Sequence, residues 1–208
     1  MQSYKTVEKQ ASAEFVEKRS RFIGYVCPVS TVDEANAFIA DISKKHFDAK
    51  HNVYAYILKD GSVKKYSDDG EPQGTAGMPV LEVMEKNGLF DVCIVVTRYF
   101  GGILLGGGGL FRAYTQAAKL AIEAGGIACV SLCCVMSLEC DYGFYSKANL
   151  LITERGGVIT DSEFGENVHL VFHIGAGYAD NISDSVFETS NGKFRPKKID
   201  ECYLKTKN

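Results

Sequence analysis

The sequence predicts an α+β protein made of two α/β sandwich domains. Its 208 residues suffice for one large domain or two small ones. Short segments with strand character alternate with amphipathic helical segments along the whole chain. Two adjacent glycines, Gly125 and Gly126, follow a long predicted helix and mark the expected boundary. We therefore expect one domain over residues 1–125 and a second over residues 126–208.

The first domain is expected to open with two strands and then to mix helices and strands. Ala35, Phe38 and Ile42 recur at helical spacing after Asp33, and Pro79 suits the first turn of a later helix. The expected strands are Phe15–Lys18, Phe22–Val26, Val53–Leu58 and Asp91–Tyr99. The expected helices run from Asp33 to about Lys45, from Val80 to Lys86, and from Leu110 to about Ala124.

The second domain is expected to follow the order strand, helix, strand, strand, helix, strand. That order describes the split βαβ, or ferredoxin-like, plan. The expected strands are Ile127–Cys140, Val158–Ser162, Val168–Ile174 and Lys197–Leu204, and the expected helices are Tyr145–Arg155 and Asn181–Ser190.

Composition limits the class of protein. With 46% hydrophobic and 24% charged residues, the chain has the balance of an ordinary globular protein. A net charge of −3 argues against nucleic-acid binding by the charge of the whole body. Residues 1–125 hold 15 basic and 15 acidic residues, however, so a local basic patch stays open.

The sequence shows no signal peptide and no apolar run of about 20 residues. We therefore expect a cytoplasmic protein with free thiols and no membrane partner. Four cysteines crowd residues 129–140 and raise the alternative of a zinc site, but their spacing is unlike that of zinc fingers or ribbons and favours buried thiols on a strand. Neither a metal nor another cofactor is expected.

The glycine-rich segment over residues 101–109 is the strongest local signal, since it holds six of the 21 glycines. Glycines between a strand and a helix let backbone N–H groups and the helix dipole approach an anion such as phosphate. The spacing matches neither a P-loop nor a dinucleotide fingerprint. Arg98 and Arg112 flank the segment and would complete an anion site, with Tyr99, Phe100 and Tyr114 available for stacking on bases. The alternative is close packing of helix on sheet, with Arg98 paired to an acidic neighbour.

A polar segment over residues 67–79, SDDGEPQGTAGMP, is the second signal. Asp68, Asp69 and Glu71 would suit a hard cation or an acid and base pair, although a rigid turn with side chains bonded to backbone N–H groups is the favoured interpretation. His51 lies at the start of a predicted strand and is the histidine whose setting best suits a general base. A small hydrolase or phosphate-ligand enzyme using His51, Asp68, Asp69 and Glu71 is therefore the alternative function.

Four segments together resemble the bacterial YigZ branch of the IMPACT family. They are SRFI at residues 20–23, AKH at residues 49–51, residues 67–79, and VTRYFGGILLGGGGLFRAY at residues 96–114. The resemblance implies a first domain with the fold of the second domain of small-ribosomal-subunit protein five. It implies a second, ferredoxin-like domain similar to the late domains of elongation factor G.

Eukaryotic IMPACT proteins restrain the amino-acid-starvation kinase that acts on a translation initiation factor. The resemblance thus implies a translation- or stress-associated regulator, and the leading hypothesis is a non-enzymatic protein that binds RNA, a ribosomal component or a translation-related protein. DNA sequence specificity is not expected, and a protein-binding adaptor is a further alternative. No catalytic residue is assigned. The residues that match the family motifs form the expected recognition surface: His51, Asp68, Asp69, Glu71, Gly74, Thr75, Gly77, Arg98, Tyr99, Gly101, Gly102, Gly106, Arg112 and Tyr114.

Overall fold

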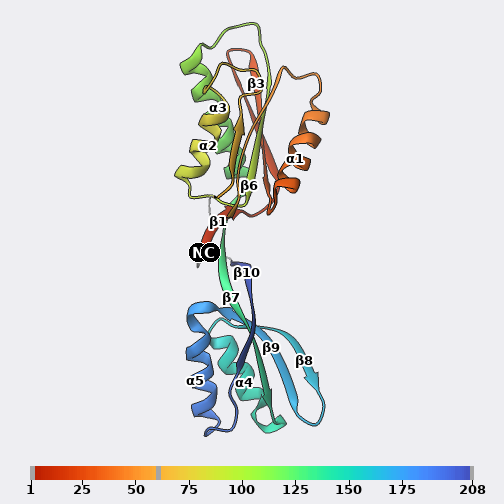
Figure 1. The fold of residues 1–208 in the computed structure, drawn as a ribbon, viewed down its shortest axis with the longest axis vertical. Helices are drawn as coiled ribbons and strands as arrows, with labels where there is room; N and C mark the ends of the chain where they lie inside the picture. The colour runs from red at the N-terminus through yellow and green to blue at the C-terminus, as the bar shows by residue number, and fades with distance from the viewer. Residues whose placement is uncertain (1–2, 60–61, 207–208) are drawn as a thin grey trace. The chain divides into compact units, whose positions relative to one another are not determined.

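The structure is a computed structural model that describes residues 3–59 and 62–206. The chain divides into two compact units, an N-terminal unit over Tyr4–Cys129 and a C-terminal unit over Val130–Thr206 (Figure 1). Both units combine helices with a β-sheet, which confirms the predicted α+β class. Among the described residues, no helix is both long and apolar enough to cross a membrane.

The sheet of the N-terminal unit has the strand order β2-β3-β6-β4-β5, and every neighbouring pair is antiparallel. Its strands are β2 (Ala11–Glu17), β3 (Ser20–Pro28), β4 (His51–Ile57), β5 (Lys64–Ser67) and β6 (Val92–Tyr99), and a further strand, β1 (Ser3–Val7), precedes them. Its helices are α1 (Val32–Lys45), α2 (Gly77–Lys86) and α3 (Gly107–Gly125).

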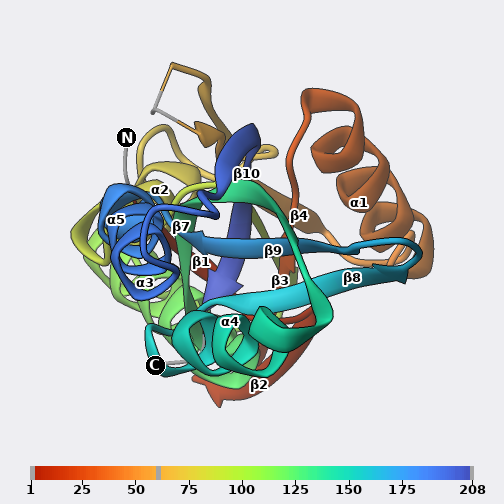
Figure 2. The same cartoon turned by 90° about the horizontal axis from the view of Figure 1, so that it is seen from below.

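Helix α1 covers one face of this sheet, and α2 and α3 cover the other (Figure 1 and Figure 2). Central strand β6 supplies both cores because successive side chains of a strand point to opposite faces. Val92, Ile94 and Val96 belong to the core that contains residues of α2 and α3. Cys93 and Val95 belong to the core under α1.

Helix α3 lies unusually close to the sheet at Gly24 of β3. A Cβ atom on Gly24 would lie 2.4 Å from the carbonyl oxygen of Ala117 in α3, so only glycine fits there. The same face of α3 presents small buried residues, Ala113, Ala117 and Ala121. Close helix-to-sheet packing, the alternative considered for the glycine-rich segment, thus occurs at Gly24, which lies outside that segment.

The turn between β2 and β3 consists of Lys18 and Arg19, since Glu17 pairs with Ser20. Both turn residues have positive φ angles, 44° and 66°. Two central residues with positive φ are the hallmark of a type I′ turn, which suits the twist of a hairpin but favours Asn and Gly. Lys18 and Arg19 are therefore held in a backbone conformation that L-residues adopt at some cost in free energy.

The C-terminal unit has the predicted element order, with β7 (Ile127–Cys140), α4 (Tyr142–Glu154), β8 (Val158–Phe164), β9 (Val168–Gly175), α5 (Ala179–Thr189) and β10 (Lys197–Thr206). β7 pairs with β1, with β10 and, antiparallel, with β9, and β9 pairs antiparallel with β8. The order β10-β7-β9-β8 places the first strand between the last and the third, as the ferredoxin-like plan requires. Helices α4 and α5 lie together on one face of this sheet (Figure 1).

The structure adds two strands that the sequence did not predict, β1 and β5. β5 is a four-residue edge strand of sequence KKYS that is mostly exposed, so it has no buried face and no alternation of apolar and polar residues to reveal it. The polar segment over residues 67–79 is less irregular than expected, because Ser67 ends β5 and Gly77 already begins α2.

Candidate functional site

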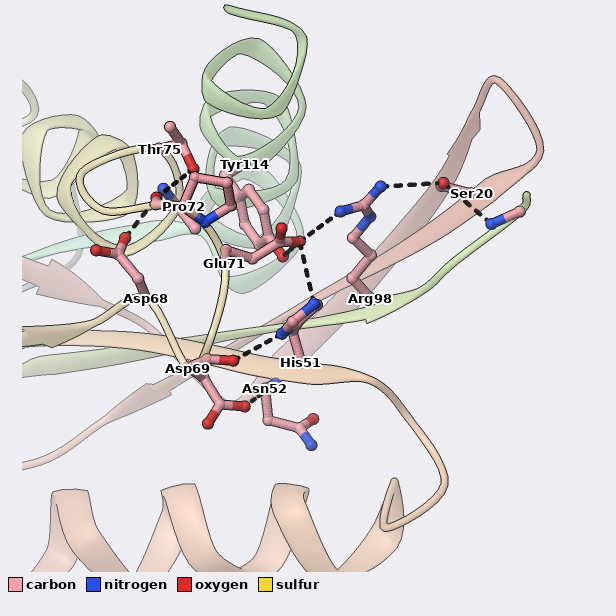
Figure 3. A network of polar contacts seen from close by, with 12 residues as sticks. Ser20, His51, Asn52, Asp68, Asp69, Glu71, Pro72, Thr75, Arg98 and Tyr114 are labelled. Carbon is pink, nitrogen blue, oxygen red and sulfur yellow. Dashed lines mark hydrogen bonds and ion pairs between the residues drawn. The ribbon is translucent and has the colours of Figure 1, made fainter. Parts of the chain in front are cut away.

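A pocket of about 410 Å³ lies in the N-terminal unit where β6 ends and α3 begins. Three segments contribute to it: the head of β4, the loop between β5 and α2, and the loop from β6 into α3. Its walls are formed by Lys50, His51, Gly70, Glu71, Pro72, Arg98, Phe100, Leu104, Leu105, Gly106, Gly107 and Leu110. Figure 3 shows the polar contacts around its buried wall.

Arg98 and Glu71 form the buried wall of the pocket. Arg98 follows Val96 by two positions on β6, so its side chain points to the face covered by α2 and α3. Its Nη1 atom donates to Oε1 of Glu71 at 2.5 Å, and both side chains are more than nine-tenths buried. The hydroxyl of Tyr114 donates to the same oxygen at 2.8 Å. Burial, together with the Glu71 carboxylate, raises the pKa of Tyr114 and keeps this hydroxyl a donor.

The guanidinium of Arg98 retains unused hydrogen-bonding capacity. Its Nη2 atom reaches the hydroxyl of Ser20 only at 3.5 Å, and its buried Nε atom has no hydrogen-bond partner among the described residues. The rings of Phe22 and Phe100 lie 5.4 and 5.6 Å from its central carbon. Arg98 thus lines the pocket as a positively charged group with an unsatisfied donor.

His51 is held opposite Arg98, since the two residues pair across β4 and β6. Its Nδ1 atom lies 2.6 Å from the backbone carbonyl oxygen of Asp69. A carbonyl only accepts, so Nδ1 carries the hydrogen. The other ring nitrogen, Nε2, has Glu71 Oε1 at 3.9 Å, beyond hydrogen-bond reach (Figure 3). His51 lines the pocket, and its Nε2 atom is turned toward Glu71 at the buried wall.

The two aspartates of the loop serve its own backbone. The carboxylate of Asp68 accepts hydrogen bonds from the backbone N–H groups of Gly74, Ala76 and Gly77 at 2.8–3.1 Å. Because Gly77 begins α2, Asp68 satisfies donors at the start of that helix. The carboxylate of Asp69 accepts from the backbone N–H of Asn52 at 2.6 Å. Neither aspartate lines the pocket.

The start of α3 contributes free backbone donors to the pocket. Gly106 occupies the N-cap position without a side-chain cap, and the first turn contains no acidic residue. The first N–H groups of a helix have no partner within it, and the helix dipole makes this end positive. Gly106 and Gly107 line the pocket, so these donors stand beside the buried wall of Arg98 and Glu71.

Three glycines of the expected surface have backbone roles. Gly102 and Gly106 have φ angles of 82° and 72°, which glycine adopts without strain. A Cβ atom on Gly101 would lie 2.0 Å from the carbonyl carbon of Arg19, so the chain after β6 packs directly on the turn between β2 and β3. Gly101 also donates its N–H to the hydroxyl of Ser20 at 3.2 Å.

Tyr99 and Arg112, which were predicted to join Arg98 in one site, face other parts of the N-terminal unit. Tyr99 points to the face under α1, where its hydroxyl donates to Asp48 at 3.0 Å and contacts Nδ1 of His46 at 2.9 Å. Arg112 is exposed and lines a separate groove with Lys18. The two arginines expected to share one anion site therefore line two neighbouring hollows, which have only Leu105 in common.

Of the remaining predicted residues, Gly74 and Gly77 donate to Asp68, and the hydroxyl of Thr75 donates to the carbonyl of Pro72 at 2.6 Å. The sequence did not predict seven of the lining residues as part of the site: Lys50, Gly70, Pro72, Leu104, Leu105, Gly107 and Leu110. Lys50 and Gly107 adjoin predicted site residues, so proximity in sequence was the signal for them. Leu104, Leu105 and Leu110 gave no such signal, since leucines in these positions fit a buried helix equally well.

A metal centre has no support in the part of the chain described. No three His, Cys, Asp or Glu side chains among residues 3–59 and 62–206 are grouped to hold an ion. Cys133, Cys134 and Cys140 are buried on β7 as free thiols, and the aspartates of the polar segment are engaged as described above.

Comparison with known proteins places this chain among relatives of one kind. The Impact N-terminal domain family matches residues 18–122, and the Domain of unknown function DUF1949 family matches residues 138–193. IMPACT family member YvyE of Bacillus subtilis is 38% identical, with 98% of this chain and 94% of the relative covered. IMPACT family member YigZ of Escherichia coli is 32% identical, with 88% and 92% covered.

More distant matches are shorter. Protein IMPACT of Rattus norvegicus is 35% identical over 45% of this chain and 31% of its own length. Among solved structures, a crystal structure of a hypothetical protein is 30% identical and has a TM-score of 0.62, with 96% of this chain and 98% of that chain covered. Because both family matches and the relatives that span most of the chain agree, this chain belongs to the IMPACT family.

Proposed function

We propose that this protein is a non-enzymatic regulator associated with translation, and that it binds RNA by holding a phosphate in the pocket at the start of α3. One observation carries the proposal: the uncapped end of α3 shares a pocket with the nearly buried side chains of His51 and Arg98. Backbone donors, a guanidinium and an imidazole are the groups that bind phosphate in proteins.

The surroundings of the pocket favour RNA over a small anion. Exposed Lys50 lies at its wall, and Phe100, which is 45% exposed, offers a ring of the kind on which bases stack. The neighbouring groove with Lys18 and Arg112 begins across Leu105 and provides cations for an adjoining part of the backbone. With few cations involved, we expect modest affinity that weakens with salt.

The test is binding of a labelled single-stranded RNA by fluorescence anisotropy across a range of salt concentrations. Lys50→Ala combined with Arg112→Ala removes exposed cations from both hollows. We expect the affinity to fall about tenfold and the slope of log affinity against log salt to become shallower by about 1.4, or about 0.7 per lost phosphate contact.

Lys44→Ala is the matched control, because Lys44 is an exposed lysine on α1, away from both hollows. It should leave both quantities unchanged. Absence of RNA binding by the unmodified protein, or an unchanged affinity in the double variant, would refute the proposal.

Hydrolysis is the second candidate function, and the orientation of His51 is the observation in its favour. The carbonyl of Asp69 accepts from Nδ1 and so fixes the tautomer, and Nε2 lies beside Glu71 at the wall of the pocket. Asp68 and Asp69, the other carboxylates of that hypothesis, hold the loop instead. Turnover of RNA or of a simple phosphate ester that disappears in His51→Gln would favour this candidate over binding alone.

A further inference from the structure

We propose that the pocket at the start of α3 takes the terminal phosphate monoester of an RNA strand and discriminates against an internal phosphodiester. This inference rests on the proposed function and names the part of the RNA that enters the pocket. It follows from the depth of the polar groups, the apolar character of the walls and the charge balance at the buried end.

The depth of the polar groups in the pocket favours a terminal phosphate over an internal one. Arg98 is 5% exposed and His51 is 8% exposed, so a ligand must enter the pocket to reach either group. Arg98 Nε, which lacks a hydrogen-bond partner among the described residues, belongs to one of these deep side chains. His51 Nε2 lies 3.9 Å from the Glu71 carboxylate at the same depth. An internal phosphodiester carries a ribose on each side, whereas a terminal phosphate carries only one. A terminal phosphate therefore reaches deeper between the same walls.

The walls around the polar end are apolar. Leu105 and Leu110 stand on the side of α3, and Pro72 stands on the side of the loop after β5. A second ribose pressed against these walls would lose water from its hydroxyl groups without gaining a polar partner. The volume of about 410 Å³ lies in the range of small-ligand pockets and accommodates one nucleotide.

The charge of the ligand also favours a terminal phosphate of the RNA. A phosphate monoester carries about −1.5 to −2 charges at pH 7, whereas an internal diester carries one. The pocket presents Lys50 and Arg98 against the single carboxylate of Glu71, with the positive end of α3 beside them. Because the attraction grows with the charge of the ligand, the positive potential that remains after Glu71 offsets one cation favours a dianion over a monoanion.

The experiment compares one RNA sequence in three forms: with a 5′-phosphate, with a 3′-phosphate, and with hydroxyl groups at both ends. Affinity is measured by anisotropy with an internal label at a single salt concentration. We expect at least one phosphorylated form to bind about tenfold more tightly than the form with two hydroxyl ends. The two phosphorylated arms establish which end supplies the monoester, and adenosine monophosphate should compete with the preferred form.

His51→Gln removes the imidazole from the wall of the pocket and should bring the ratio of affinities close to one. Thermal unfolding establishes that the variant is folded, and a ratio is insensitive to the fraction of active protein. Lys50→Ala provides an independent exposed variant and should also lower the ratio. Lys44→Ala should leave it unchanged.

The outcomes separate this inference from the function on which it rests. Equal binding of all three forms would overturn the inference and leave RNA binding intact. A preference for phosphorylated ends that persists in both His51→Gln and Lys50→Ala would overturn the assignment to this pocket. Failure of every RNA form to bind would overturn the proposed function, and adenosine monophosphate binding in that case would show a site for a free nucleotide instead.

Discussion

Arg98 and Glu71 form an ion pair in which the two side chains are only 6% and 4% exposed. Bringing two charges out of water is costly, and their attraction roughly offsets that cost only when the geometry is good and further hydrogen bonds are made. Tyr114 supplies such a bond to the same carboxylate oxygen. The pair therefore contributes more to the position of Arg98 beside the pocket than to the net free energy of folding.

Glu71→Gln should lower the free energy of unfolding by about 3–5 kcal/mol, because it leaves the guanidinium of Arg98 buried without a counter-charge. Urea denaturation measures the loss. Combining Glu71→Gln with Arg98→Met should recover much of it, since the buried charge is then removed as well. Glu85→Gln, which breaks an exposed pair with Lys64, should cost no more than about 1 kcal/mol. A loss as small as this for Glu71→Gln would contradict the prediction.

Asp68→Ala should destabilise the N-terminal unit by about 2–4 kcal/mol, since three backbone N–H groups lose a charged acceptor and α2 loses the carboxylate at its start. Asp69→Ala removes one such bond and should cost about 1 kcal/mol. Denaturant unfolding of both variants measures whether Asp68→Ala loses more stability than Asp69→Ala. If the two losses were equal, the role of Asp68 as the organiser of the loop would be refuted.

His46 should make stability depend on pH. Burial, and then the nearby charge of Lys45, lower the pKa of His46 in the folded protein. The unfolded chain, with a pKa near 6.5, therefore binds a proton more readily. The contribution of His46 is complete above about pH 6.5 and is lost as pH falls toward the folded pKa.

The hydrogen bonds around His46 agree with a neutral ring. Tyr99 donates its hydroxyl hydrogen to Asp48, so its oxygen accepts from Nδ1 of His46, and Nε2 accepts from Tyr25 at 2.6 Å. Protonation would leave the hydroxyl of Tyr25 without this acceptor. Free energies of unfolding at pH 7.5 and 5.5 should differ less in His46→Gln than in the unmodified protein, and an identical difference would rule out His46 as a source of the pH dependence.

Replacing Lys18 and Arg19 together by Asn and Gly should raise the free energy of unfolding by about 1 kcal/mol, because both residues have positive φ angles and Asn-Gly suits a type I′ turn. The same change should weaken RNA binding, since Lys18 lines the groove with Arg112. Thermal unfolding measures the expected gain in stability, and fluorescence anisotropy measures the expected loss of RNA affinity. Lower stability in the double variant would show that the side chains, and not the backbone, decide the energetics of this turn.

The sequence predicted the elements with a buried face and failed where local pattern carries no information. β6 was predicted because its sequence is a continuous hydrophobic run, which the structure buries on both faces of the sheet. The order of elements in the C-terminal unit was predicted because segments with strand character alternate with segments with helical character. β5 was missed because an exposed edge strand has no such pattern.

The site shows the same division between local and long-range information. Tyr99 was grouped with Arg98 because the two are adjacent in sequence, yet adjacent strand residues face opposite sides of a sheet. Arg112 was placed with Arg98 because both flank the glycines. Arg112 lies in the second turn of α3, and its side chain lines another groove. The ion pair of Arg98 with Glu71 joins residues distant in the chain, so the sequence offered only an unspecified acidic partner.

The place of β6 in the middle of the sheet has a consequence for synthesis of the chain. β3 and β4 precede β6 by many residues, yet they meet only through it, as the pairs Phe22 with Arg98 and Val53 with Val96 show. The hairpin of β2 and β3 can form early. The five-stranded sheet can form only after β6 has left the ribosome, and closure of such long loops slows folding. During that interval the apolar faces of β3 and β4 stay uncovered, so this protein should depend on chaperones most while residues 29–99 are being made.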